Sequence, residues 1–156
     1  MTDQQFEEFA KQWPDLFQKS GDFELSVGYG WYTIINTLFA LISSDVERAK
    51  SRLKFAMDNP DKKMNQTIEE LEAAVEEAID NLPIIDQVKE KFGTLRFYVS
   101  NSSEKLDRYI VFAESMSGVM CEVCGAPGER RSGSWIRTLC NAHSKEADKH
   151  DAGPGL

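Results

Sequence analysis

The chain has 156 residues, of which 41% are apolar and 28% are charged, and its 26 acidic and 18 basic side chains give a net charge of -8. This is the composition of a globular protein of ordinary domain size, and it excludes a collagen, a low-complexity disordered chain and a membrane bundle. The acidic balance also argues against a broadly basic nucleic-acid-binding surface.

No segment predicts membrane insertion or export. The longest apolar stretch, residues 31–42, is too short to cross a bilayer. The first residues lack the positive start and the apolar run of a signal peptide. We therefore expect a soluble protein of the cytoplasm that does not enter a membrane.

The first part of the chain predicts helical structure followed by a short strand. Phe6, Phe9 and Trp13 recur at helical spacing until Pro14 interrupts the pattern. Such a stripe is more typical of a core face than of a cofactor stack. Apolar residues then alternate over residues 23–27, which predicts a short strand.

Gly28 and Gly30 flank a tyrosine directly after this strand. A phosphate-binding loop would need a third glycine, but Thr33 stands at that position and no Gly-Lys-Ser/Thr sequence follows. We therefore interpret the pair as a tight entry into a helix. Residues 31–42 are apolar over a wide arc, which predicts the central buried helix of the fold.

Two capping patterns predict the next two helical segments. Ser44 and Glu47 predict the start of a second, more polar segment, and residues 58–66 predict a polar loop after it. Thr67 and Glu70 form the clearest capping box in the chain, and a helix with one apolar face follows them.

The other faces of that helix are strongly acidic and include Glu69, Glu72, Glu76 and Glu77. A helix with this charge could imitate the phosphate backbone of DNA and thereby bind a protein partner. The plainer interpretation is a solvated helix face, which is what a charge run on one side of a helix normally forms. The sequence favours the plainer interpretation.

The last third of the body predicts a helix, a strand and a helix. Residues 83–91 predict a short helix that begins at Pro83 and ends before Gly93. Alternation over residues 94–99 predicts the second strand. Residues 101–118 predict a last helix that starts with a serine cap.

The three cysteines all lie in the last 36 residues, and an odd number in a cytoplasmic chain is a poor disulfide framework. Cys121 and Cys124 form a C-x2-C pair, and Cys140 and His143 form a C-x2-H pair after a 15-residue arm. This spacing is typical of a tetrahedral zinc site. Four protein ligands leave no open position for a water molecule, so the sequence predicts one structural Zn²⁺ ion.

A redox-active dithiol or an iron–sulfur site is the alternative interpretation of the first cysteine pair. It would leave the second pair, Cys140 and His143, without an explanation. The turn signals between the two pairs instead predict a hairpin over residues 128–139, followed by a helix over residues 141–149. A knuckle, a hairpin and a ligand-bearing helix resemble a treble-clef zinc finger.

The predicted fold class is therefore α+β. We expect a mostly helical body over residues 1–120 with a small sheet of two strands, near 23–27 and 94–99. A treble-clef-like zinc element over residues 121–150 should pack on this body, and residues 151–156 form a tail.

Three blocks of the sequence resemble a group of small, mostly uncharacterised proteins of bacteriophages, prophages and bacterial genomes. The blocks are GYGWYTII at residues 28–35, VKEKFGTLRFYV at residues 88–99, and AESMS running into CEVCGAPG and WIRTLC over residues 113–140. Similar proteins use Cys or His as the last ligand, which His143 matches. The resemblance implies a phage-like origin and a zinc knuckle, and it brings no agreed activity with it.

We expect a protein that is not an enzyme. The chain lacks the His-Glu-x-x-His, Gly-x-Ser-x-Gly and Walker motifs and the His-x-Glu sequence of a zinc deaminase. Apart from His143, the chain has one histidine, His150, in a polar tail. The expected function is binding to a protein partner, and small phage accessory proteins often inhibit a host or defence complex in the bacterial cytoplasm in this way.

Nucleic-acid binding through the zinc hairpin is the alternative function. Arg130, Arg131 and Arg137 flank Trp135, which offers cations for phosphates and a ring for stacking. Residues 121–156 hold five basic and five acidic side chains, while the remainder of the chain holds 13 basic and 21 acidic. Repulsion by this negative charge disfavours a nucleic-acid partner.

Overall fold

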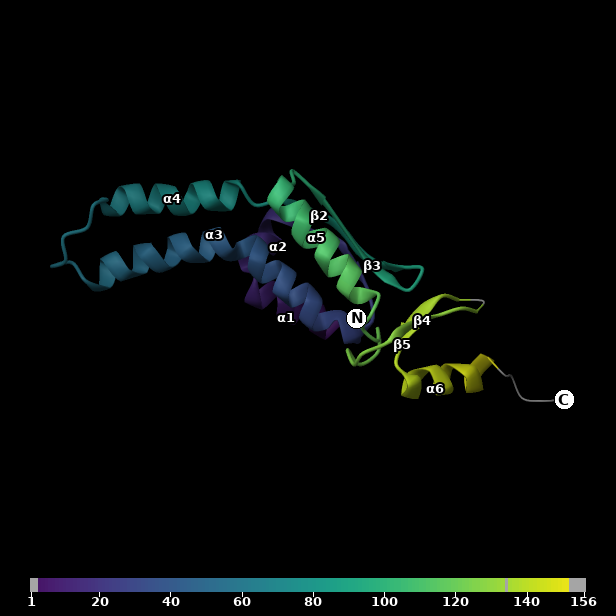
Figure 1. Ribbon diagram of the computed structural model, residues 1–156. Helices are drawn as coiled ribbons and strands as arrows, with labels where there is room; N and C mark the ends of the chain where they lie inside the picture. Colours follow the sequence, from purple (N-terminus) through teal and green to yellow (C-terminus); the bar gives the residue numbers. More distant parts are fainter. Residues whose placement is uncertain (1–2, 134, 152–156) are drawn as a thin grey trace.

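The computed structural model describes residues 3–133 and 135–151, with side chains over residues 4–133 and 135–147. The molecule is elongated: a helical hairpin extends from one end of the body, and a small element of residues 121–147, with the candidate metal ligands, lies at the other end (Figure 1). The predicted tail therefore lies outside the described residues, except for the backbone of Asp151.

The chain begins with two helices, a short strand and a 3₁₀ turn. These are α1 (Asp3–Gln12), α2 (Pro14–Ser20), β1 (Glu24–Ser26) and η1 (Tyr29–Trp31). Pro14 occupies the first turn of α2, where its missing N–H costs no hydrogen bond. The predicted interruption at this proline and the predicted strand near residues 23–27 are both confirmed.

Helix α3 (Tyr32–Asp58) is continuous, and it packs along α4 (Ile68–Asp80) as a long hairpin. The predicted start of a separate segment at Ser44 is wrong. The Ser44 hydroxyl donates to the carbonyl oxygen of Leu41 at 2.8 Å, so it bonds within the helix instead of capping a new one.

The capping box that starts α4 is confirmed. The backbone N–H of Thr67 donates to Glu70 Oε2 at 2.9 Å, and the backbone N–H of Glu70 donates to Thr67 Oγ1 at 3.2 Å. Residues 59–67 form the connection between the two helices, close to the predicted loop. The reciprocal pair satisfies two donors that the first turn of a helix leaves unpaired.

The sheet has the order β1-β2-β3, with β2 (Ile84–Lys91) parallel to β1 and antiparallel to β3 (Thr94–Ser100). The strand predicted near residues 94–99 is confirmed. The helix predicted over residues 83–91 is wrong, because this segment forms the central strand of the sheet.

A β-bulge explains the wrong prediction. The register with β3 shifts between Ile85 and Gln87, which leaves Asp86 as the extra residue. In a regular strand Ile85 and Val88 would point to opposite faces, but the bulge lets both be buried, with 1% and 0% exposed. Apolar residues three positions apart imitate the spacing of a helix face.

The turn between β2 and β3 consists of Phe92 and Gly93, which have φ angles of 54° and 76°. Two successive residues with positive φ are typical of the tight type I′ hairpin turn. Gly93 therefore closes a hairpin and not a helix. The aromatic side chain of Phe92 is left 60% exposed at the tip.

The last body helix is α5 (Glu104–Ser117), and its first turn is capped by Ser103, whose Oγ accepts the backbone N–H of Leu106 at 3.2 Å. This confirms the predicted serine cap. The hairpin strands β4 (Glu129–Arg131) and β5 (Arg137–Leu139) and the helix α6 (Asn141–Asp151) complete the predicted order of elements. Ser134 lies outside the described residues.

Phe39 of α3 occupies the centre of the core. Its ring makes edge-on contacts with Phe9, Phe17 and Phe97, at centroid distances of 5.1, 5.6 and 5.9 Å. These contacts join α1, α2, α3 and β3. The other residues with at most 1% exposed are Leu16, Trp31, Ile35, Val46, Ile85, Val88, Leu95, Ser117, Cys121 and Thr138, and Phe9 is fully buried as predicted.

The metal-binding element, residues 121–147, packs directly on the body. Its backbone approaches the glycine segment (residues 28–30): the N–H of Gly30 donates to the carbonyl oxygen of Glu122 at 2.8 Å. The indole of Trp31 donates to the carbonyl oxygen of Met120 at 2.9 Å. The Thr138 hydroxyl donates to the carbonyl oxygen of Gly93 at 2.5 Å. The predicted division of the chain at residue 120 stays a prediction, but the two parts share a buried interface.

Within residues 3–133 and 135–151, no helix combines the length and the apolar character that a membrane span needs.

The glycine segment yields a first prediction. A Cβ atom at position 30 would collide with the carbonyl oxygen of Cys121 and would lie 2.6 Å from the backbone nitrogen of Gly125. Because both are backbone atoms of a tight turn, the Gly30→Ala variant should lose about 3 kcal/mol of unfolding free energy in urea titrations.

Gly133→Ala is the matched control. The nearest atom to its added Cβ is 3.9 Å away, so unfolding should change by less than about 0.5 kcal/mol. Equal stability of the two variants would contradict the close approach between the glycine segment and the metal-binding element.

Candidate metal centre

Four side chains converge at the far end of the molecule. The Sγ atoms of Cys121, Cys124 and Cys140 and a ring nitrogen of His143 all lie within 4.8 Å of one another. Among the described residues this is the group of His, Cys, Asp and Glu side chains that could hold a metal ion. The sequence prediction that the two pairs share one site agrees with this geometry.

The first pair lies on a tight knuckle. The backbone N–H of Gly125 donates to the carbonyl oxygen of Cys121 at 2.8 Å, and the N–H of Cys121 donates to the carbonyl oxygen of Ala126 at 2.8 Å. Gly125 has a φ of 75° and sits against the backbone of Gly30, so no larger residue fits there. The turn aims both thiols of the C-x2-C pair at one point.

The second pair stands at the start of α6. Cys140 directly precedes the helix and its carbonyl oxygen accepts the N–H of Ser144 at 2.9 Å. His143 lies three positions after Cys140, so their side chains share one face of the first turn. Figure 1 shows this helix beside the β4–β5 hairpin, which is the order of elements in a treble clef.

Three of the distances between ligand atoms are close to those of a tetrahedron. Metal bonds of about 2.3 Å to sulfur and about 2.0 Å to nitrogen place two sulfurs about 3.8 Å apart and a sulfur and a nitrogen about 3.5 Å apart. The Sγ atoms of Cys124 and Cys140 are 3.9 Å apart. His143 Nδ1 lies 3.5 Å from the Sγ of Cys121 and 3.3 Å from that of Cys140.

The backbone around the site favours thiolates. The backbone N–H of His143, aided by the His143 ring and the N–H of Ala142, lowers the pKa of the Cys140 thiol to about 6. Burial alone would raise the pKa of Cys121, but backbone N–H groups of Cys140, Cys124 and Val123 lower it overall. Both sulfurs are therefore prepared to bind a cation.

The sulfurs of Cys121 and Cys140 in turn raise the pKa values of the other two groups, His143 and Cys124. The side chain of Cys140, and then that of Cys121, raise the pKa of the His143 ring. The N–H of Ala126 favours the thiolate of Cys124, but burial and the neighbouring Cys121 and Cys140 side chains raise its pKa overall. Three sulfurs cannot all ionise this close together unless a positive charge joins them, and a metal ion supplies that charge.

A carboxylate lies near the outer nitrogen of the histidine. His143 faces the thiols through Nδ1, while its Nε2 lies 4.0 Å from a carboxylate oxygen of Glu146. A carboxylate behind a ligating imidazole favours the tautomer that leaves the inner nitrogen free for the metal. The four groups could therefore hold one metal ion in a closed site, which has no position for a reacting water molecule.

The predicted nucleic-acid contacts do not form one exposed basic face. Arg137 Nε donates to Glu122 Oε1 at 2.5 Å, and Arg131 donates to Asn141 Oδ1 at 2.7 Å. Arg130 donates to the carbonyl oxygen of Phe92 at 2.8 Å but keeps an exposed side chain. The indole of Trp135 is 69% exposed. All three arginines thus donate hydrogen bonds within the protein, and Arg130 is the most exposed of them.

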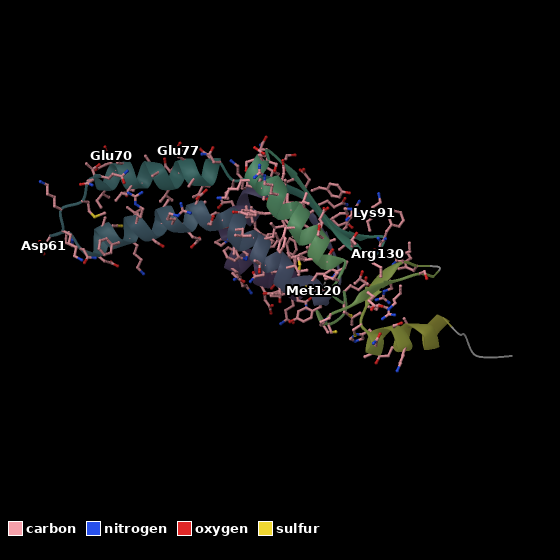
Figure 2. All side chains as sticks on the ribbon, in the orientation of Figure 1. Asp61, Glu70, Glu77, Lys91, Met120 and Arg130 are labelled. Atoms are coloured by element: carbon pink, nitrogen blue, oxygen red, sulfur yellow. The ribbon has the colours of Figure 1, made fainter. Side chains whose placement is uncertain are left out.

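The acidic residues of α4 lie far from this site. Glu69, Glu72, Glu76 and Glu77 are all exposed, as expected for a solvated helix face. Figure 2 shows Glu70 and Glu77 on the helical hairpin at one end of the molecule, and Lys91 and Arg130 towards the other end. The described residues show no contact between the acidic helix and the metal-binding element.

Sequence reasoning missed Glu122. This residue stands between two ligands as an apparent spacer, yet it is only 7% exposed and pairs with Arg137 across the hairpin. The available signal was a charged residue between two predicted metal ligands, in a chain that also has closely spaced glycines at positions 28 and 30. The side chain of the second histidine, His150, lies outside the described residues.

Comparison of the chain with protein-family models, curated proteins and solved structures finds no match.

The metal centre yields a second prediction. Purified protein should contain one metal ion per chain by elemental analysis. Cys140→Ser should lose most of this metal and lower the melting temperature by about 10 °C, because metal binding contributes to the folding free energy of so small an element. Ser132→Ala, a nearby change outside the ligand set, should keep the metal. A Cys140→Ser protein with full metal content would contradict the site.

A third prediction concerns pH. The pKa of the Cys140 thiol is about 6 in the folded protein, compared with an ordinary value of 9.0. Ionisation of this thiol therefore stabilises the fold fully only above about pH 9, and this contribution is lost as the pH falls through about 6. His143, whose pKa is raised, takes up a proton in the same direction. Chelator competition should therefore show weaker metal binding at about pH 5.5 than at about pH 7.5. Constant affinity over this range would argue against thiolate and imidazole ligands.

Proposed function

We propose that this protein is a non-enzymatic binding module stabilised by one zinc ion, and that its partner is a protein. The apolar groove between α3 and α5 carries this proposal. In this proposal the metal ion stabilises the fold, and the partner binds to the surface of the body.

Zinc is the proposed ion because of the donor set. Three thiolates and one imidazole suit a borderline-soft cation with tetrahedral coordination. A closed four-ligand site at the end of a chain segment with little core of its own is typical of structural zinc. Zinc in elemental analysis, in place of iron, would support this assignment over an iron–sulfur site.

The helical groove is formed where α5 crosses α3, and it has a volume of about 190 Å³. Its lining is apolar apart from threonine hydroxyls and comprises Thr33, Ile34, Thr37, Leu38, Leu41, Tyr109, Phe112, Ala113, Met116 and Met120. Phe112 on its rim is 66% exposed, and Val111 beside it is 62% exposed. Adjacent exposed apolar side chains over a groove mark an interaction surface.

An amphipathic helix of a partner protein fits this groove best. Grooves between two helices accept apolar side chains that recur every three or four residues on a partner helix. Aromatic residues and methionine are enriched at protein interfaces, and Met116 and Met120 can adapt their shape to the side chains that enter.

The arginine contacts support a protein partner over nucleic acid. Arg131 and Arg137 are engaged with neighbouring groups, and the body carries the excess of negative charge. The resemblance to phage and prophage proteins supports a bacterial host or defence complex in the cytoplasm as the target, whose inhibition would be the biological effect.

Replacement of Phe112 by glutamate tests the proposal. The change puts a charge on the rim of the groove and, because the side chain is largely exposed, should alter the melting temperature by only about 2 °C or less. Immobilised wild-type protein should retain a bacterial protein from lysate that the Phe112→Glu variant releases, with binding weakened at least about tenfold.

Phe55→Glu is the matched control, since Phe55 is 45% exposed near the distal end of α3 and outside the groove. It should retain the partner. Equal binding by wild type and the Phe112→Glu variant would remove the groove from the interaction. If light scattering instead finds that the wild-type protein is a dimer and the Phe112→Glu variant is a monomer, the occupant of the groove is a second copy of this chain.

A further inference from the structure

The three sulfurs of the candidate metal centre differ in their access to solvent. Cys121 is fully buried, whereas Cys124 is exposed and Cys140 is partly exposed. The two accessible cysteines belong to different ligand pairs, one on the knuckle and one directly before α6. Their Sγ atoms lie 3.9 Å apart. A reagent in solution therefore reaches two neighbouring sulfurs and not the third.

The knuckle holds Cys121 in place. Its backbone N–H donates to the carbonyl oxygen of Ala126, and its carbonyl oxygen accepts the N–H of Gly125, both at 2.8 Å. The next residue, Glu122, donates its backbone N–H to the carbonyl oxygen of Thr138 at 2.9 Å. These bonds leave Cys121 little freedom to move towards another sulfur.

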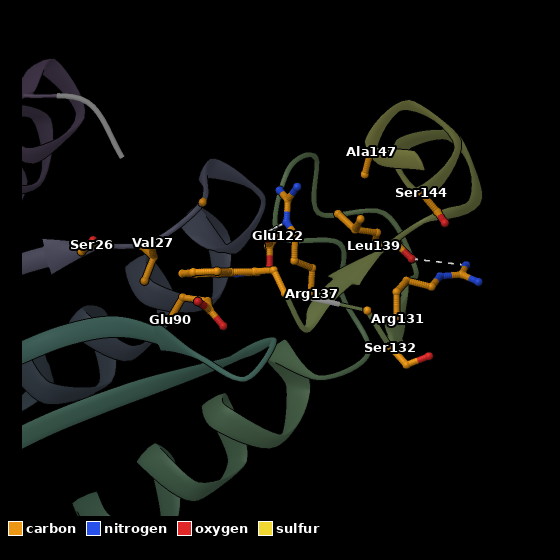
Figure 3. A pocket seen from close by; sticks show the side chains of 13 residues that line it. Ser26, Val27, Glu90, Glu122, Arg131, Ser132, Arg137, Leu139, Ser144 and Ala147 are labelled. Atoms are coloured by element: carbon orange, nitrogen blue, oxygen red, sulfur yellow. Dashed lines mark hydrogen bonds and ion pairs between the residues drawn. The ribbon is translucent and has the colours of Figure 1, made fainter. Parts of the chain in front are cut away.

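Helix α6, which follows Cys140, has room to shift. It faces the body across a cavity of about 680 Å³. Figure 3 shows Val27 of the body on one side of this cavity and Ser144 and Ala147 of α6 on the other. The shift that a disulfide needs is small, because the Sγ atoms of Cys124 and Cys140 must approach from 3.9 Å to about 2.05 Å.

We infer that the candidate metal centre is also a redox switch, in which a hydroperoxide joins Cys124 to Cys140 in a disulfide and thereby releases the metal ion. Oxidation removes two of the four ligands, and Cys121 and His143 alone do not make a closed site. The other two possible disulfides both need Cys121, which is buried and fixed by its backbone.

The reaction has two steps and consumes one molecule of hydrogen peroxide. In the first step, the Cys124 thiolate attacks a peroxide oxygen, so an S–O bond forms, the O–O bond breaks and hydroxide leaves. In the second step, the Cys140 thiolate attacks the same sulfur, so the S–S bond forms, the S–O bond breaks and a second hydroxide leaves. Two electrons pass from the thiolates to the peroxide, and two protons from solvent convert the hydroxides to water.

The effect of this switch on recognition rests on the proposed function. Met120 lines the helical groove and lies directly before Cys121 in the chain. Loss of the ion loosens the knuckle beside the groove, so the oxidised protein should bind its partner more weakly. Formation of the disulfide and release of the ion do not depend on the partner, and they test the switch by itself.

Peroxide treatment of the full-length, zinc-loaded protein tests the inference. The readouts are released zinc, measured with a colorimetric chelator, and disulfide mapping by mass spectrometry. Hydrogen peroxide should release one zinc ion for each disulfide formed, and dithiothreitol with added zinc should restore the metal content. Dithiothreitol does not reduce methionine sulfoxide, so this recovery excludes oxidation of Met120 as the cause of the release.

Proteolysis distinguishes the three possible disulfides. Trypsin leaves Cys121 and Cys124 in one peptide and Cys140 in another. Cleavage after Glu122 then separates the first two cysteines. The expected cross-linked product therefore contains Cys124 and Cys140 but not Cys121.

A substitution separates the switch from the metal site. Cys124→His removes the exposed thiol but keeps four ligands, because two cysteines and two histidines also form a tetrahedral zinc site. This variant should bind zinc, and peroxide should release the ion at least about tenfold more slowly than from wild type. Ser132→Ala, the control outside the ligand set, should release zinc at the wild-type rate. If Cys124→His binds no zinc, the disulfide map of the wild-type protein decides the question.

Three outcomes would overturn the inference. The first is a disulfide that contains Cys121 or joins two chains. The second is zinc that stays bound under a peroxide treatment that fully oxidises the chelator-stripped protein. The third is release from zinc-loaded Cys124→His at the wild-type rate. If Phe112→Glu abolishes partner capture while one of these outcomes is found, the proposed function stands and the switch fails. If the switch operates but the wild-type protein captures no partner, the proposed function fails alone.

Discussion

The fold depends on the close approach of two backbone segments, the glycine segment at residues 28–30 and the knuckle at residues 121–125. The N–H of Gly30 donates to the carbonyl oxygen of Glu122, and Gly125 lies against Gly30. Side chains at these glycines would hold the two segments apart. Because helix α3 begins directly after one segment and the metal ligands lie on the other, the central helix and the metal centre support each other. A metal ion bound by these ligands would therefore stabilise the body as well as the small element that carries them.

The proposed helical groove reaches the same junction. Met120 lines the groove, and Cys121 of the candidate metal site follows it directly in the chain. Trp31 anchors this stretch from the body through its hydrogen bond to the Met120 carbonyl oxygen. A metal ion held by the four side chains would fix the backbone beside this groove.

The sequence predicts an element correctly where the residues that determine it lie close together in the chain. The Thr67 capping box, the strand at residues 94–99 and the four ligands could be found because their spacing alone defines them. The strand β2 could not, since a bulge at Asp86 gives its apolar residues the spacing of a helix. The backbone contact between Gly30 and Glu122 also could not be found, because it joins segments about 90 residues apart in the chain.

The helical hairpin of α3 and α4 has a practical use. Its connecting loop, residues 59–67, lies at the tip that points away from the metal-binding element (Figure 1). The residues that line the helical groove come from other parts of the chain. A biotin attached at Lys63 on this loop would therefore hold the molecule on a sensor with the groove facing the solution.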